Sequence, residues 1–156
     1  MKQHVGVGTI LWAALSFTTL PAFASLGGSL ATVNDDATTE SVTATKTASF
    51  ALYDVYQIKT AKAEVREFVS NDKAQVFAVI WTKGKGHIDL KQYLGQTNFK
   101  AYMQAERKTP VKPGRLPRRI EVGNLTVITA GHMNSVTGKA YISDLVPPGL
   151  DINTIQ

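Results

Sequence analysis

Alternating apolar and polar residues predict a sheet in the middle of this chain. Three segments of strand length, at 50–60, 64–69 and 76–81, are separated by short polar connections. The second segment carries charged residues between its apolar ones, as in a strand with one side in water. The third is apolar at every position, so we expect a central strand that is covered on both faces.

The spacing of apolar residues becomes helical after residue 87. From 87 to 108 they recur at intervals of three and four, and Gly95 interrupts the run. A proline-rich loop follows over 109–119, and further strands are expected at 120–122, 125–129 and 139–143. Strands around one helical segment, without βαβ alternation, predict the α+β class. We expect an antiparallel sheet of about five strands with one helix, whole or broken at the glycine, packed on a face.

The first 24 residues have the pattern of a signal peptide. Lys2 gives a positive start, an apolar stretch runs from Val5 to Leu15, and Ala22 and Ala24 are small residues at the positions that a signal peptidase reads. We therefore expect cleavage after residue 24 and export to the periplasm or the outside of a Gram-negative bacterium. An uncleaved membrane anchor is the alternative, although polar residues shorten the apolar stretch.

The amino-acid composition of residues 25–156 predicts three regions. Residues 25–49 are rich in Ser, Thr and Ala, with few large apolar side chains, and this predicts a flexible lead. Residues 50–146 form the predicted single domain, and 147–156 the predicted C-terminal tail. The chain has no cysteine, which excludes disulfides, thiol catalysis, thiolate metal sites and a cysteine-linked lipid anchor.

Charge gives the first candidate function. Between Lys83 and Arg119 there are ten basic and two acidic residues, a net charge of 10 − 2 = +8. On a helix and a loop these bases would form a patch for anions. The candidate binding residues are Lys100, Arg107, Lys108, Lys112, Arg115, Arg118 and Arg119. A merely solvated basic surface is the alternative.

Export would limit the partners of such a patch to components outside the cytoplasm. Candidates are lipopolysaccharide, anionic lipid, acidic polysaccharide and an acidic exported protein. Aromatic residues are not interleaved with the bases in an RNA-binding pattern, so the sequence does not favour nucleic acid. The leading hypothesis is a non-enzymatic, envelope-associated binding domain. A structural subunit of a larger exported assembly is another possibility.

A hydrolase-type enzyme centred on His132 is the alternative from another class. This histidine follows a predicted strand, where loops often carry chemistry, and Arg66 is a second candidate for the site. Arg66 and Glu67 are neighbours on a strand and therefore point to opposite faces, so they are expected to be solvated or in cross-strand ion pairs. A histidine bonded to nearby backbone would have no such role.

Other catalytic and cofactor signals are missing from the sequence. There is no Gly-x-Ser-x-Gly elbow and no glycine-rich phosphate loop. After residue 24 the chain has two imidazoles, His87 and His132, which are too few and too far apart to indicate a metal site. The sequence therefore predicts no cofactor and no metal.

Several motifs together resemble a known family. They are VREFVS at 65–70, VFAVIW at 76–81 and GHM at 131–133. The chain is similar in these to exported proteobacterial proteins catalogued only as a domain of unknown function. The resemblance implies export and a single domain, but no activity. The segment 83–87 departs from the expected Gly-Pro and Pro-Asp loop, so a shared role of that loop stays open.

Overall fold

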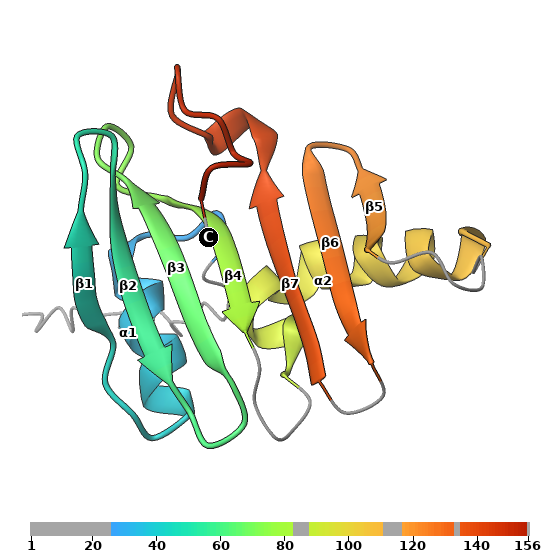
Figure 1. Cartoon of the computed structure of the whole chain (residues 1–156), viewed down its shortest axis with the longest axis horizontal. Coiled ribbons are helices and arrows are strands. Elements are labelled where there is room, and N and C mark those ends of the chain that lie inside the picture. The colour runs from blue at the N-terminus through green and yellow to red at the C-terminus, as the bar shows by residue number, and fades with distance from the viewer. Residues whose placement is uncertain (1–25, 83–87, 111–116, 133–134, 156) are drawn as a thin grey trace, which may run out of the picture.

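Seven antiparallel strands form one sheet, and two α-helices lie behind it on the same face (Figure 1). The computed structural model describes residues 26–82, 88–110, 117–132 and 135–155. The strand order is β1-β2-β3-β4-β7-β6-β5. The elements are α1 (Leu30–Thr39), β1 (Thr45–Ser49), β2 (Tyr53–Lys59), β3 (Glu64–Ser70), β4 (Val76–Thr82), α2 (Leu90–Lys108), β5 (Arg118–Val122), β6 (Leu125–His132), β7 (Ser135–Ile142) and a 3-10 turn η1 (Ser143–Leu145).

The predicted α+β class is confirmed, with more elements than expected. The additional helix α1 and strand β1 lie within residues 25–49, so the prediction of a flexible lead is wrong for the described part of that region. Val33 and Ala37 of α1 are buried against the sheet. The helix has too few apolar residues to show helical spacing in the sequence, and β1 is a polar, mostly exposed edge strand.

The central strand was predicted correctly. β4 is buried from Val76 to Trp81 and is the fourth of the seven strands. On the face covered by the helices, Val79 and Trp81 belong to the larger hydrophobic core. On the opposite face, which we call the open face, Phe77 and Ile80 belong to a smaller core.

Helix α2 begins at an N-cap and is broken at Gly95, which is one of the two alternatives that the sequence left open. The Asp89 side chain accepts a 3.0 Å hydrogen bond from the backbone N–H of Lys91. Gly95 has φ 77°, a left-handed conformation that glycine adopts without strain, and the helix is kinked there. Nε2 of Gln92 donates a buried 3.0 Å hydrogen bond to the carbonyl oxygen of Asp36, which joins α2 to α1.

The C-terminal segment packs on the open face. Nζ of Lys139 on β7 donates to the carbonyl oxygens of Ile152 at 2.9 Å and Ile155 at 3.0 Å. Ile155 is 2% exposed. The predicted tail is therefore a packed segment at residues 150–155, held by a lysine that the sequence analysis did not single out. Among the residues that the structure describes, no helix is long and apolar enough to span a membrane.

Candidate functional site

Part of the predicted basic segment lies on the outward side of α2. Lys100, Arg107 and Lys108 are exposed there, together with Lys91. Glu106 is the acidic residue within this helix, and it is half-buried. Two further predicted residues, Lys112 and Arg115, lie outside the described part of the chain.

Arg118 joins β5 to the end of α2. Its Nη1 lies 2.9 Å from Oε1 of Glu106, and its Nη2 donates to the carbonyl oxygens of Glu106 at 2.8 Å and Thr109 at 3.1 Å. The Tyr102 hydroxyl donates to the same carboxylate at 3.2 Å. Because the guanidinium is engaged in these contacts, Arg118 stabilises the packing of α2 and is poorly suited to a mobile anion patch.

Arg119 lies on the other side of the sheet from Arg118, since consecutive strand residues point to opposite faces. Its Nε donates to Oε1 of Glu121, and its Nη2 donates to the Tyr141 hydroxyl at 3.0 Å. The hydrogen bond to Glu121 raises the pKa of Arg119. The predicted basic segment is thus divided between the outward side of α2 and the open face.

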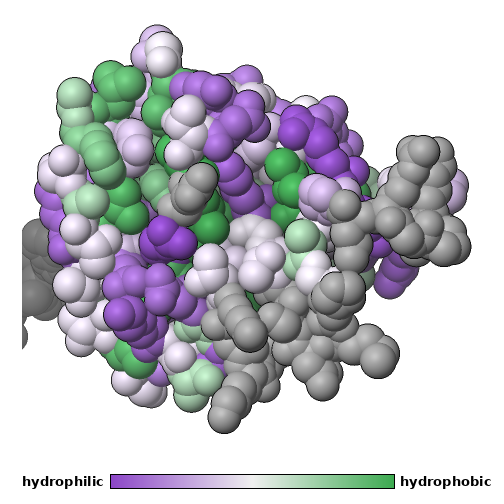
Figure 2. All heavy atoms as spheres, viewed as in Figure 1, coloured by the Kyte–Doolittle hydropathy of each residue, from purple (hydrophilic) through white to green (hydrophobic). Residues whose placement is uncertain are grey.

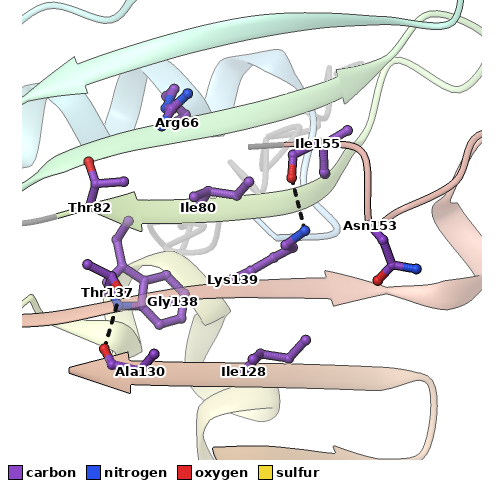
Figure 3. Close-up of a pocket in the computed structure, with 11 residues that line it drawn as sticks. Arg66, Ile80, Thr82, Ile128, Ala130, Thr137, Gly138, Lys139, Asn153 and Ile155 are labelled. Atoms are coloured by element: carbon purple, nitrogen blue, oxygen red, sulfur yellow. Dashed lines mark hydrogen bonds between the residues drawn. The ribbon is translucent and has the colours of Figure 1, made fainter. Parts of the chain in front are cut away.

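The open face has a hollow of about 430 Å³. Figure 2, which views this face, shows hydrophilic and hydrophobic residues side by side over the strands. The hollow lies over β3, β4, β7 and β6, and the C-terminal segment forms one wall (Figure 3). Among the residues that the structure describes, its lining includes two cations, Arg66 and Lys139, with apolar side chains between and beside them, and no carboxylate.

The two cations flank Ile80. Arg66 on β3 pairs with Ile80 on β4, which pairs with Lys139 on β7, and the row continues to Ile128 on β6. Paired residues share a face, and neighbouring strands lie about 4.8 Å apart, so the backbones of the two cations are about 10 Å apart. Figure 3 shows Ile80 between the strands that carry Arg66 and Lys139.

The two cations have different surroundings. Nε of Arg66 lies 3.8 Å from Oε1 of Glu64 on the same strand, and the Glu64 carboxylate also accepts a 2.6 Å hydrogen bond from Gln57. Lys139 is partly buried. Its burial lowers the pKa of its ammonium group, and the charge of Asp151 acts in the opposite direction.

Arg66 and Glu67 point to opposite sides of the sheet, as predicted. Arg66 lines the hollow, whereas Glu67 is fully buried on the helix side, so the expectation that Glu67 is solvated is wrong. Glu67 lies in the same buried region as Asp36 and Tyr93, and burial raises the pKa of the Tyr93 phenol, with the charges of Glu40 and Glu67 adding to the effect. The helices cover this acidic cluster, which keeps it from a solvent-borne substrate.

His132 ends β6, where it pairs with Ser135 of β7. Its side chain lies outside the described part of the structure, so the hydrolase hypothesis stays a prediction. Position 132 is two residues beyond Ala130, which lines the hollow. Within the described ranges, no three histidine or acidic side chains gather where they could hold a metal ion.

Lys139 did not stand out in the sequence as a candidate site residue. Neither did Thr137 and Asn153, which line the same hollow. One signal was available for Lys139: it is a lone charge in a predicted strand, between Gly138 and Ala140. No sequence signal linked Asn153 to the sheet, because a short polar segment after two prolines reads as a tail.

One comparison with known proteins gives a match. The family model described as "Protein of unknown function (DUF2844)" matches residues 22–155. That range includes the motifs at 65–70, 76–81 and 131–133. No curated protein and no solved structure matches the chain.

Proposed function

We propose that this protein, which belongs to the DUF2844 family, is a non-enzymatic exported domain that binds an anionic envelope component through the outward side of α2. One observation supports this proposal above others. The four exposed charged residues of α2, at positions 91, 100, 107 and 108, are all cations. The signal-peptide pattern of residues 1–24 supports the exported location.

The spacing of these cations suits an extended anionic surface. Arg107 and Lys108 follow Lys100 by seven and eight residues, so they lie on the same side of the helix as Lys100 and about 10–12 Å from it along the axis. Each basic residue near an anionic membrane surface contributes roughly 1 kcal/mol of attraction, and this attraction is screened by salt. Lipid head groups, lipopolysaccharide phosphates and acidic polysaccharide all present charges at repeated intervals. An acidic exported protein would be a more restricted partner.

Cosedimentation of the full chain with vesicles that contain phosphatidylglycerol would test the proposal, with lipopolysaccharide in a parallel assay. We expect retention at low ionic strength and release at about 1 M salt, where the screening length falls to about 3 Å. The double variant Lys100→Gln/Arg107→Gln should lose most of the retention. Arg118 is unsuitable for this test because its contacts stabilise the fold.

A matched control removes the same charge elsewhere. Lys59 and Lys62 are exposed near the connection between β2 and β3, away from α2. The variant Lys59→Gln/Lys62→Gln should retain binding. Equal losses in the two double variants would mean that net charge alone determines retention. That result, or the absence of retention at low salt, would overturn the assignment of the α2 surface.

A further inference from the structure

We propose that the hollow on the open face binds a small amphipathic carboxylate, with its head group between Arg66 and Lys139 and its apolar part over Ile128 and Ala130. This site is separate from the outward side of α2, because the hollow and the helices lie on opposite faces of the sheet. The inference therefore adds a second ligand and does not depend on the proposed function.

Charge selects the head group. Within the described ranges, the lining side chains carry two positive charges, on Arg66 and Lys139, and no carboxylate. Oε1 of Glu64, on the same strand, lies 3.8 Å from Nε of Arg66. A guanidinium has five N–H donors in a planar fork, and this geometry matches a carboxylate even when another group holds one donor.

Lys139 is positioned to complete this recognition. Its ammonium group has three N–H donors, of which two are used by the carbonyl oxygens of Ile152 and Ile155. These bonds fix the amine between β7 and the C-terminal segment, at the edge of the hollow (Figure 3). A side chain that is held in place before binding loses less conformational entropy when a ligand arrives.

The rest of the hollow favours an apolar body. Ile80, Ile128 and Ala130 form its floor on β4 and β6, and Ile155 contributes to the wall. A volume of about 430 Å³ falls within the range of roughly 300–1,000 Å³ that small-molecule sites occupy. Such sites combine a mainly apolar surface with a few polar groups that orient the ligand, as the hollow does.

A carboxylate suits the site better than a phosphate monoester. The monoester carries about −1.5 to −2 charges near neutral pH and three strong acceptor oxygens. Apart from Arg66 and Lys139, the described lining residues whose side chains carry a hydroxyl or an amide are Thr82, Thr137 and Asn153. The Thr137 hydroxyl already donates to the Ala130 carbonyl oxygen, and the Asn153 amide to Asp151. The lining side chains therefore have few remaining hydrogen-bond donors for the second negative charge of a phosphate monoester.

Calorimetry can report binding directly, and tryptophan fluorescence can follow it indirectly. The chain has two tryptophans, Trp12 and Trp81, and Trp81 borders the hollow although its side chain is buried in the larger core on the helix side. In the full chain with Trp12→Phe, calorimetric titration with decanoate should show saturation, and any change in the Trp81 emission should give the same Kd. Decan-1-ol and decyl phosphate are the matched probes. We expect decanoate to bind about tenfold more tightly than the alcohol, because it gains charge-assisted hydrogen bonds.

Variants separate the charged part of the site from the apolar part. Arg66→Gln should weaken decanoate binding about tenfold and leave decanol binding unchanged. Ala130→Leu keeps both cations but fills the hollow, and it should weaken both probes. Arg107→Gln on α2 removes one charge away from the site and should change neither.

Three results would overturn the proposal. The first is the absence of saturable decanoate binding. The second is equal binding of decanoate to Arg66→Gln, Ala130→Leu and the parent chain. The third is tighter binding of decyl phosphate or decanol than of decanoate, which would contradict the carboxylate assignment. Because vesicle retention depends on α2, failure of the hollow and failure of the α2 surface are distinguishable.

Discussion

Arg118 on β5 places its guanidinium 2.9 Å from the carboxylate of Glu106 on α2. The same guanidinium also donates to two backbone carbonyl oxygens near the helix end. These contacts join the last turn of the helix to the edge strand of the sheet. Arg118 therefore has a structural role that does not depend on whether the basic segment binds a ligand.

Replacing Arg118 by Met should destabilise the fold. It leaves the Glu106 carboxylate and two carbonyl oxygens without a charged donor, and we expect a loss of about 2 kcal/mol in the free energy of unfolding. Urea denaturation followed by circular dichroism would measure it. Arg107→Met, an exposed neighbour, should change the free energy by less than about 0.5 kcal/mol. Equal stability of the two variants would contradict this structural role.

Gly138→Ala should be among the most damaging single-methyl substitutions. A Cβ atom at Gly138 would lie 2.3 Å from Cζ2 of Trp81 and 2.5 Å from the carbonyl oxygen of Ile128. The carbonyl belongs to the adjacent strand, so the expected loss is about 3 kcal/mol. Gly123→Ala is the comparison, since nothing lies within 4 Å of its Cβ position and only its φ of 59° is unfavourable. It should cost about 1 kcal/mol. A wild-type unfolding midpoint for Gly138→Ala would show that β7 can move away from Trp81.

Helix α1 should contribute to stability, although its composition resembles a flexible lead. Val33 is fully buried between α1 and the sheet. We expect Val33→Ala to lower the free energy of unfolding by about 2 kcal/mol, through lost transfer energy and an unfilled space. Asn34→Ala on the exposed side of the helix should have an effect within about 0.5 kcal/mol. If both variants unfold like the parent chain in thermal melts, α1 does not dock as described.

The stability of the protein should fall in alkaline solution partly through Tyr102. Burial, reinforced by the charge of Glu106 and by the hydrogen bond to it, raises the pKa of Tyr102 to about 12 from its usual 10.0. The folded state holds this proton more tightly than the unfolded state, so the contribution is complete below pH 10 and is lost as the pH rises through about 12. Unfolding measured across this window should show a shallower fall for Tyr102→Phe than for the parent chain. An identical slope would show that the phenol titrates normally.

The sequence predicted the elements with strong patterns and missed those whose stability comes from tertiary packing. β4 is apolar at each of its buried positions and was predicted correctly, and Gly95, named as the point where the helix could break, is where α2 is kinked. β1 is an edge strand with polar residues on both faces, and α1 buries a narrow stripe that includes Val33. The stability of such elements comes from packing against segments that are distant in the sequence, so the local pattern of apolar residues does not reveal them.

The candidate sites follow the same rule. The basic residues were identified because they lie close together in the sequence. On β5, however, the Arg118 and Arg119 side chains point to opposite faces of the sheet, and the face that each one takes depends on the strand register. The hollow combines residues from β3, β4, β6, β7 and the C-terminal segment. Arg66 and Lys139 lie on either side of Ile80 only because β4 pairs with both of their strands. No sequence motif describes an arrangement of that kind.

The strand order also has a consequence for how the chain reaches its fold. β1 to β4 pair in succession along the chain, and so do β5 to β7, whereas β4 and β7 meet across α2 and two intervening strands. Local hairpins form quickly, but the Ala78–Tyr141 pairing requires closure of a long loop before its contacts are gained. We therefore expect the pairing of β4 with β7 to be slower than the local pairings within β1–β4 and β5–β7. Because this pairing also brings together the floor of the hollow, the proposed carboxylate site would form late in folding.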